Sequence, residues 1–359
     1  MGGQGGAGGS AGATGGAAGA GADAGCSLAH APTPTTGADP GGNIEFVVAT
    51  RTIDLGDRDV GGGPTWPNLG YDLDKVCTCG TDTVGSCKAP KKIVCDGVDG
   101  RDNAFGSFVY QIRTVFKVSD LSSDTLTTKI EGGGNTVLIR VRGYNGTPND
   151  ASVEVTWMAS DDFDVFNTLP PKWDGTDAWP VLSSSLVAGT APDGGVSYSV
   201  ENGKYLDKGA YVSNGTLVAS LPQGSFALTA ATSLNFTAAL FTAKIQAVAG
   251  GAWALENGVL AGITKVSDVL GVLPSVDDPF SGKPICMDNL LYVGVKSMIC
   301  DYPDMSILGT PATPCDYLSL GVSVSGAPAK LGKVSVKPTK PSVCAAGQNP
   351  AEDSCTPGG

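Results

Sequence analysis

Apolar and polar residues alternate along much of the chain, and this alternation predicts β-strands. Val153, Val155 and Trp157 share one face of an extended segment, while the residues between them are polar. One apolar and one polar face are typical of a strand that is buried on one side only. The segments 44–49 and 136–142 are predicted to be strands on similar grounds.

Asn-Gly pairs between such runs predict hairpin turns, because this dipeptide suits the positive φ angles of a type I′ turn. The pairs begin at Asn145, Asn202, Asn214 and Asn257. The last pair is expected to join two hairpin arms, 253–255 and 259–261. Repeated hairpins favour antiparallel sheets over alternating strands and helices. The predicted fold class is therefore mainly β, with antiparallel β-sandwich or jelly-roll-like units stapled by disulfides.

Helix signals are sparse. Thr264 is a suitable N-cap for a helix over 265–273, which a proline follows. Apolar residues at roughly helical spacing predict a second helix over 283–298. We therefore expect one or two short helices beside the sheets.

We expect four parts along the chain. The stretch 170–180 has two tryptophans, several prolines and no regular period, which indicates a boundary between two β units. The four parts are a disordered Gly/Ala-rich tether (1–42), a first β-sandwich unit with a cysteine cluster (43–180), a second β-rich unit with short helices (181–335) and a disulfide-closed tail (336–359). The tether begins with 25 residues that include twelve Gly and eight Ala, too little apolar surface to offset the entropy of ordering. One interleaved sandwich with long insertions fits the periodicity equally well.

Cysteine usage indicates an oxidising compartment. The ten cysteines are an even number, and four lie within nineteen residues, a spacing typical of disulfides in exported proteins. A four-thiolate zinc site among the same four residues is the alternative, but paired zinc thiolates favour two or more intervening residues. We predict the pairs Cys79–Cys87, Cys77–Cys95 and Cys344–Cys355, with the second helix held to the body from Cys286 or Cys300 through Cys315. We also expect an export signal that is removed from this numbering.

The balance of charges and the near absence of histidine exclude several functions. The chain has 35 acids against 23 bases, a formal net charge of -12, which argues against nucleic-acid binding. The single histidine, His30, lies in the predicted tether. A Ser/His/Asp triad, a Cys/His pair and a histidine-ligated metal are therefore not expected. A transmembrane span is not expected either, since the most apolar long stretch, 233–255, contains Asn235, Lys244 and Gln246.

An acidic, glycine-rich loop is the sharpest candidate site. Its candidate calcium ligands are Asp96, Asp99, Asp102 and Asn103. Calcium takes six to eight hard oxygen ligands, and glycine lets backbone carbonyls join them. Asp72 and Asp74 complete the site if the cysteine cluster brings them close. The loop lacks the final glutamate of an EF-hand, and a tight turn in which Asp and Asn bond their own backbone is the alternative.

Paired carboxylates are the one catalytic apparatus that the composition allows. Glu154 with one of Asp161, Asp162 or Asp164 is the candidate pair for glycoside hydrolysis. The alternative is that these are solvated strand and turn residues.

A loop with two tryptophans offers flat apolar faces beside carboxylates, a combination that suits sugar rings. Its candidate ligand-binding residues are Trp173, Asp174, Asp177 and Trp179. The alternative is that both rings pack between the two predicted units.

Three features of the chain stand out together: the Gly/Ala/Ser-rich start, the segment Cys95-Asp-Gly-Val-Asp-Gly-Arg-Asp-Asn-Ala-Phe-Gly, and Ile299-Cys300-Asp301 with Pro314-Cys315-Asp316. In this layout the chain resembles uncharacterised surface lipoproteins of myxobacteria and related GC-rich bacteria. It implies an exported, envelope-anchored protein, with a lipid anchor in the native precursor, and no particular activity.

We therefore expect a non-enzymatic binding or adhesion module at the cell surface. Its expected partner is an extracellular glycan or another surface protein, with calcium as the candidate cofactor. A carboxylate-dependent glycoside hydrolase and a structural component of the envelope or of a filament are the alternatives.

Overall fold

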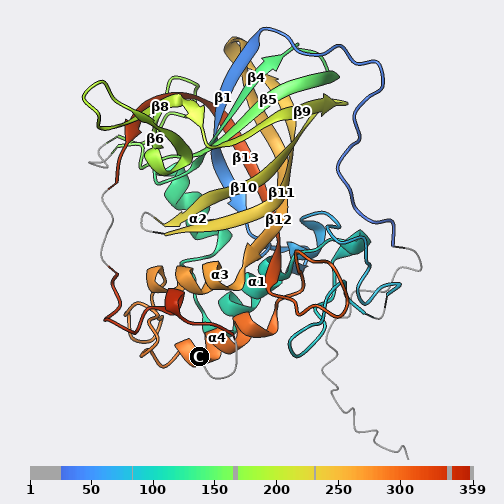
Figure 1. Ribbon diagram of the computed structural model, residues 1–359, viewed down its shortest axis with the longest axis vertical. Coiled ribbons are helices and arrows are strands. Elements are labelled where there is room, and N and C mark those ends of the chain that lie inside the picture. The colour runs from blue at the N-terminus through green and yellow to red at the C-terminus, as the bar shows by residue number, and fades with distance from the viewer. Residues whose placement is uncertain (1–25, 83, 165–168, 230–231, 338–341, 356–359) are drawn as a thin grey trace, which may run out of the picture.

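Eight antiparallel strands form a closed barrel in the computed structural model, which describes residues 26–82, 84–164, 169–229, 232–337 and 342–355 (Figure 1). The strands are β1 (Ile44–Asp54), β4 (Val137–Tyr144), β5 (Asp150–Ala159), β9 (Tyr205–Ser213), β10 (Thr216–Thr229), β11 (Thr232–Val248), β12 (Ala252–Lys265) and β13 (Tyr317–Ser335). Each of them pairs with the next one along the chain, and β13 pairs with β1 to close the cylinder.

The prediction of a mainly β, antiparallel fold is confirmed, but the sandwich or jelly roll is wrong. The closing contact runs from Val47 opposite Ala329 to Asp54 opposite Ser323. A strand with one buried face alternates in the same way in a sandwich and in a barrel, so the local pattern does not distinguish them. The boundary at residue 180 is also wrong as a division between two sheets. Strands β1, β4 and β5 precede it and β9–β13 follow it, yet all belong to one barrel.

Side chains fill the inside of the barrel. Trp157 is fully buried there, with the ring centre of Phe241 5.5 Å and that of Phe236 5.7 Å from its own, at 71° and 90° to the indole. The indole Nε1 donates to the carbonyl oxygen of Ser225 at 2.9 Å. The cavity beside Trp157 measures about 20 Å³, which is room for about one water molecule. The interior is therefore a packed core.

A second layer covers part of the outer surface. It consists of β6 (Ala178–Leu182) and the hairpin of β7 (Leu186–Thr190) and β8 (Val196–Gly203). Beyond Ala329, β13 leaves β1 and pairs in parallel with β6. Apolar residues that point outward from β1, β4 and β5 pack against apolar residues of this layer and form a second small core. The barrel contributes Ala49, Leu138 and Met158, and the layer contributes Trp179, Val181 and Leu186.

Helices pack against the barrel, and all but the second of them lie at its lower end as it is drawn in Figure 1. They are α1 (Ala104–Phe116), α2 (Ser123–Glu131), α3 (Val266–Val272) and α4 (Tyr292–Asp301). The prediction of a helix over 265–273 is confirmed by α3, although the residue at its N-cap is Lys265 rather than Thr264. The second predicted helix begins nine residues late, at Tyr292. Helices α1 and α2 were not predicted.

The remaining elements are short. They are β2 (Asp59–Val60), β3 (Gly63–Pro64) and 3-10 turns at 66–68, 98–100, 183–185, 249–251, 273–275 and 350–352. None of the helices in the described part of the chain has the length and apolar character needed to cross a membrane.

The Asn-Gly pairs differ in what they do. Asn214 (φ 51°) and Gly215 (φ 74°) form the predicted tight turn between β9 and β10. Asn257 (φ 50°) lies instead inside β12, where the register with β13 shifts between Leu255 and Gly258. The predicted hairpin of 253–255 with 259–261 is therefore wrong, since a β-bulge uses the same positive φ angle as a turn.

Five disulfides bind the described cysteines, which confirms that sulfur is committed to covalent cross-links. The pairs are Cys26–Cys77, Cys79–Cys95, Cys87–Cys315, Cys286–Cys344 and Cys300–Cys355. The predicted pairs were wrong, because partners are chosen by proximity in the fold and not along the chain. Such use of cysteine fits a protein outside the reducing cytoplasm.

Part of the predicted tether is packed against the body. The segment after Cys26 runs from the cysteine cluster along the side of the barrel to its opposite end (Figure 1). The backbone of Ala29 bonds Asp99 and Asp72, and the hydroxyl of Tyr211 donates to the carbonyl oxygen of Pro32 at 2.6 Å. The prediction of a disordered segment up to residue 42 is therefore wrong for residues 26–42, while residues 1–25 lie outside the described chain.

Candidate functional site

Three disulfides gather an irregular lobe, residues 66–103, against the lower end of the barrel. Cys26–Cys77 joins the lobe to the segment that precedes the barrel, and Cys79–Cys95 closes a loop within the lobe. Cys87–Cys315 links the lobe to the residues just before β13. Short local bonds orient its acidic side chains. Asp72 accepts from the amide of Lys75 at 2.7 Å, and Asp96 accepts from the amide of Thr78 at 2.6 Å. These bonds fix the carboxylates before any ligand is considered.

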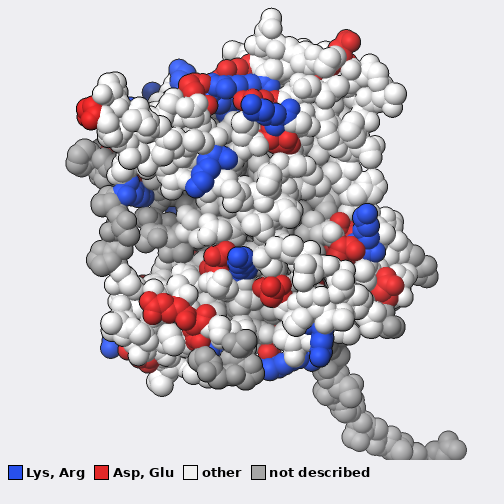
Figure 2. Space-filling model, in the orientation of Figure 1, with Lys and Arg blue, Asp and Glu red and all other residues white. Residues whose placement is uncertain are grey.

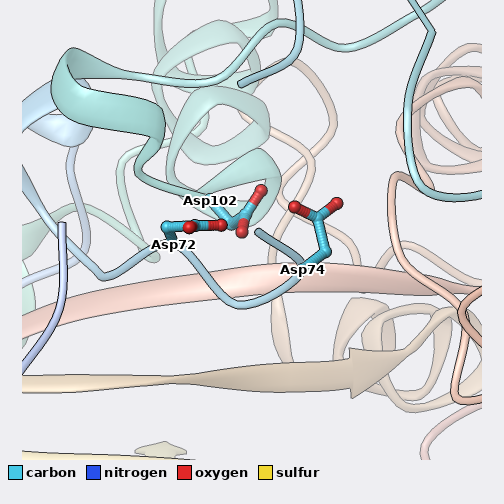
Figure 3. Close-up of side chains that lie close together, drawn as sticks. All are labelled: Asp72, Asp74 and Asp102. Atoms are coloured by element: carbon cyan, nitrogen blue, oxygen red, sulfur yellow. The ribbon is translucent and has the colours of Figure 1, made fainter. Parts of the chain in front are cut away.

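Five carboxyl groups lie together where this lobe meets the link between α4 and β13, and we call them the acidic pocket: Asp72, Asp74, Asp96, Asp102 and Asp304. Asp72, Asp74 and Asp102 each place an oxygen within 4.8 Å of the other two (Figure 3). Asp74, Asp96, Asp102 and Asp304 line one cavity of about 20 Å³, next to the Cys87–Cys315 disulfide. Asp304 comes from the link between α4 and β13, two hundred residues away in sequence.

Each carboxylate has backbone or hydroxyl donors but no cationic partner. Asp102 is 2% exposed and accepts from the amide of Leu73 at 2.6 Å. Asp304 accepts from the amide of Ser319 at 2.8 Å and from its hydroxyl at 2.5 Å. Among the described residues, no lysine or arginine forms an ion pair with any member of the pocket. The pocket therefore concentrates uncompensated negative charge.

Burial and mutual repulsion raise the pKa values in the pocket. Burial, with the charges of Asp74 and Asp304, raises the pKa of Asp96 to about 8. Burial, opposed by the bonds from Ser319, raises the pKa of Asp304 to about 7. The pKa of Asp102 is raised well above its usual value, first by burial and then by Asp74, Asp304 and Asp96. Some of these groups therefore hold protons at neutral pH when no cation is present.

The donor set fits a hard divalent cation. Ca²⁺ prefers carboxylate and carbonyl oxygens and accepts irregular arrangements of six to eight of them, whereas Mg²⁺ demands a near-octahedral shell. Asp72, Asp74 and Asp102 are the nearest set that could supply such oxygens.

The structure brings together two of the four predicted calcium ligands. Asp96 and Asp102 lie in the pocket, as do Asp72 and Asp74, which the sequence indicated as further ligands. Asp304 was missed, because nothing in the sequence links it to a loop so far away.

Asn103 and Asp99 have other roles. Asn103 is the N-cap of α1: its Oδ1 accepts from the amides of Gly106 and Gly321, both at 2.9 Å, and its Nδ2 donates to the carbonyl oxygen of Gly321 at 3.0 Å. A side chain with these bonds is not available to a metal in the pocket. Asp99 lies in a 3-10 turn at φ 58°, and its carbonyl oxygen accepts from the amide of Ala29. Neither residue lines the cavity of the pocket.

The tryptophan loop is largely a packing element. Trp179 is fully buried in the second core, and its ring centre lies 5.2 Å from that of Trp173. Asp177 is buried and accepts from the amides of Lys172 and Trp173. Trp179 is thus not available to stack against a sugar, because no part of its ring reaches solvent. Trp173 is half-buried and Asp174 is exposed.

Two of the candidate catalytic carboxylates, Glu154 and Asp161, are not brought together. Glu154 lies in the middle of β5 and pairs with Arg142 at 3.4 Å. Asp161 follows the end of that strand and pairs with Lys337 at 2.5 Å. Seven residues of extended chain span about 20 Å, well beyond the roughly 5–9.5 Å between the carboxyl groups of a glycosidase. The prediction of a Glu154–Asp161 pair is therefore wrong.

No protein-family model matches the chain, and neither does any curated protein or solved structure. The resemblance to surface lipoproteins thus stays a prediction, which rests on the residues that carry it. The acidic pocket is the most specific chemical feature of the described residues.

Proposed function

We propose that the chain is an exported, non-enzymatic binding module at the cell surface, whose disulfide-linked lobe is held in place by Ca²⁺. One observation carries the proposal: four aspartates from three separate segments, Asp74, Asp96, Asp102 and Asp304, line one small cavity. Asp72 places an oxygen within 4.8 Å of Asp74 and Asp102, and none of the five has a cationic partner among the described residues. A protein gains no stability from gathering like charges, unless a cation or protons neutralise them. The disulfides support export, because they persist only in an oxidising compartment.

Calcium bound here would act on the fold and not on a substrate. The pocket joins the lobe to the loop before β13, since Asp304 comes from that loop and the other four carboxylates from the lobe. A cation bound by both sides would cross-link them beside Cys87–Cys315. An ion that binds only the folded form raises the free energy of unfolding.

Thermal unfolding in EDTA, in millimolar Ca²⁺ and in millimolar Mg²⁺ tests the proposal. We expect Ca²⁺ to raise the Tm by several degrees over EDTA, and Mg²⁺ to raise it less. Asp102→Asn should abolish the response to Ca²⁺.

Asp99→Asn is the matched control. Asp99 lies three residues from Asp102, and Asn tolerates its positive φ, but its side chain does not line the pocket. This variant should respond to Ca²⁺ like the wild type. An unchanged wild-type Tm at millimolar Ca²⁺, or an equal response in both variants, would refute calcium binding at the pocket.

A further inference from the structure

A long surface groove lies at the upper end of the barrel, far from the acidic pocket. Two adjoining hollows, of about 420 and 570 Å³, form it and share residues of β1 and β13: Glu45, Phe46, Val47, Ala329 and Lys330. The smaller hollow also contacts Arg140 and Glu201, and the larger one Asn43 and Trp253. We call the two together the mouth groove.

The path of β13 creates the mouth groove. This strand lies between β12 and β1 over most of its length. Its last residue opposite β12 is Gly326, and its last residue opposite β1 is Ala329. It then turns outward to pair with β6. The first residues of β1 and β12 are thereby left without β13 between them. The tryptophan loop forms part of the wall, where Gly175 lies against Pro328.

One aromatic ring in the groove is held rigidly. Trp253 is half-buried, and its ring centre lies 5.3 Å from that of Tyr144 and 6.1 Å from that of Phe46. The contact with Tyr144 is perpendicular, at 82°. A ring fixed in this way loses little freedom when a ligand covers its remaining surface.

The acidic and basic side chains of the groove largely pair with one another. The guanidinium of Arg140 bonds Glu45 at 2.5 Å and Glu201 at 2.9 Å. Figure 2 shows a mixed acidic and basic group near the upper end of the molecule, while the middle of this face carries few charges. Because its bases are matched by acids, the groove lacks the excess positive charge that a phosphate or an acidic polymer would need.

The shape of the groove excludes small apolar ligands. Pockets for such ligands bury most of the ligand surface, whereas both hollows are wide and open to solvent. An open trough with a fixed indole, an amide from Asn43 and an ammonium from Lys330 suits a neutral chain with alternating apolar faces and hydroxyls. Sugar rings have these properties, since their C–H faces stack on aromatic rings and their hydroxyls bond planar polar groups.

We propose that the mouth groove binds a neutral oligosaccharide, with Trp253 as the stacking residue and Asn43 and Lys330 as hydrogen-bonding residues. This inference rests on the proposed binding role but not on the cation site. It places the sugar at Trp253, and not at the predicted Trp173 to Trp179 loop.

Isothermal titration of the full chain with cellohexaose, chitohexaose and maltohexaose tests this inference. We expect at least one of them to bind, and Trp253→Ala to weaken its binding by about tenfold or more. Trp173→Ala is the matched control and should leave the affinity within about twofold. Titrations in Ca²⁺ and in EDTA separate the two proposals, because sugar binding that persists in EDTA stands without the cation site.

A second variant guards against loss of folding, since Trp253 packs on the core. The double change Asn43→Ala with Lys330→Ala alters only exposed residues and should also weaken binding while the Tm stays unchanged. Three outcomes would overturn the inference: no binding of any hexasaccharide, loss of binding in Trp173→Ala alone, or binding only of an extended peptide such as (Thr-Val)3.

Discussion

Asn103 was predicted to be a calcium ligand, but in the structure it is the N-cap of a helix and contacts a barrel strand. Its position in an acidic, glycine-rich loop suggested calcium. In the fold it bonds the first turn of α1 and both backbone groups of Gly321 in β13. The residue therefore joins the start of a helix to the first part of a barrel strand, and the sequence contains no sign of that strand's proximity.

Asn103→Ala should destabilise the fold by about 3 kcal/mol, because it removes an N-cap and leaves buried backbone groups of Gly321 without a partner. Urea unfolding measures the change. The loss should be equal in Ca²⁺ and in EDTA, which distinguishes this role from that of a ligand. Asn43→Ala, at an exposed asparagine, should change the stability by less than about 0.5 kcal/mol.

The acidic pocket makes a prediction about pH. The pKa values of Asp96 and Asp304 are raised to about 8 and about 7, by burial first and by neighbouring carboxylates second. A raised carboxyl pKa means that the folded protein binds more protons than the unfolded one between about pH 4 and pH 8. Without Ca²⁺, the stability that these groups contribute is therefore greatest below pH 4 and is lost as the pH rises through 7 and 8.

Thermal unfolding in EDTA should show a falling Tm from about pH 5 to pH 8. The stabilisation by Ca²⁺ should grow over the same range, because the ion displaces protons. Asp102→Asn, which mimics a protonated carboxyl group, should be at least as stable as the wild type at pH 8 in EDTA. A Tm in EDTA that rises steadily to pH 8, with no difference between the two proteins, would contradict the raised pKa values.

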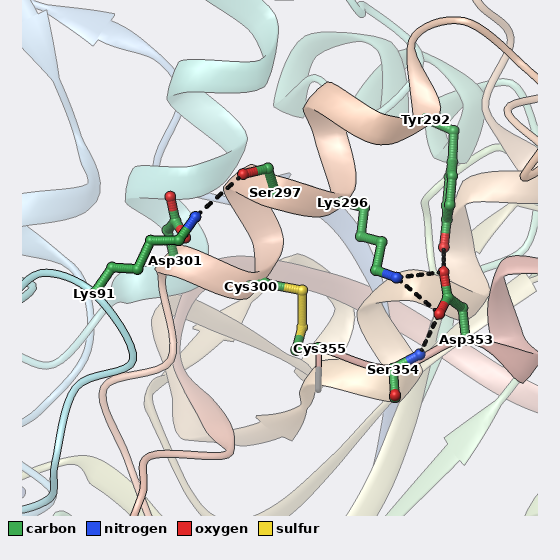
Figure 4. Close-up of a disulfide and its surroundings, with 9 residues drawn as sticks. All are labelled: Lys91, Tyr292, Lys296, Ser297, Cys300, Asp301, Asp353, Ser354 and Cys355. Atoms are coloured by element: carbon green, nitrogen blue, oxygen red, sulfur yellow. Dashed lines mark hydrogen bonds and ion pairs between the residues drawn. A yellow bond between two sulfur atoms is a disulfide. The ribbon is translucent and has the colours of Figure 1, made fainter. Parts of the chain in front are cut away.

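At the scale of elements, the C-terminal tail acts as a strap across α4. Two disulfides attach it, Cys286–Cys344 and Cys300–Cys355. Between them, Asp353 accepts from Lys296 at 2.7 Å and from the hydroxyl of Tyr292 at 2.5 Å (Figure 4). Burial alone would raise the pKa of Asp353, but the bonds from Lys296 and Tyr292 outweigh it and hold this pKa below its usual value.

Asp353→Asn should cost about 1–3 kcal/mol, since it leaves Lys296 without its carboxylate. Hydrogen exchange at the amides of Met287 and Ser354, which bond the tail, should become faster. The wild type should lose the same protection as the pH falls through the lowered pKa of Asp353, below about pH 4. The neighbouring exposed Glu352→Gln is the control, and equal exchange in both variants would contradict the strap.

At the scale of the molecule, one disulfide connects two parts of the fold that are far apart in sequence. Cys87–Cys315 joins the lobe to β13 across 228 residues of sequence, whereas Cys79–Cys95 closes a loop across 16. Closing a longer loop removes more entropy from the unfolded chain, by upper estimates of about 5 and about 3 kcal/mol for these two cases. The long cross-link therefore contributes most to the stability of the whole barrel.

Replacing both members of each pair by serine tests this ranking. Cys87→Ser with Cys315→Ser should lower the free energy of unfolding by more than Cys79→Ser with Cys95→Ser, when both are measured by urea unfolding without reductant. The second double variant serves as the control for loss of a local disulfide in the same lobe. An equal or reversed order would show that the lobe does not depend on its long-range connection to the barrel.

The sequence by itself determined what depends on neighbouring residues. The alternation around Val153 and Trp157 predicted a strand, Asn214-Gly215 a tight turn and 265–273 a helix, and each is found. These features follow from side-chain period and backbone preference, which act over a few residues. The ten cysteines likewise indicated disulfides without indicating their partners.

Only the tertiary structure decided what depends on distant contacts. Closure of the barrel needs β1 beside β13, the acidic pocket needs Asp304 beside Asp102, and the mouth groove exists because β13 turns away from β1. Asn257-Gly258 is a bulge and not a turn because β12 continues past it along β13. In each case the same local pattern is compatible with several arrangements, and the packing of segments far apart in sequence selects one of them.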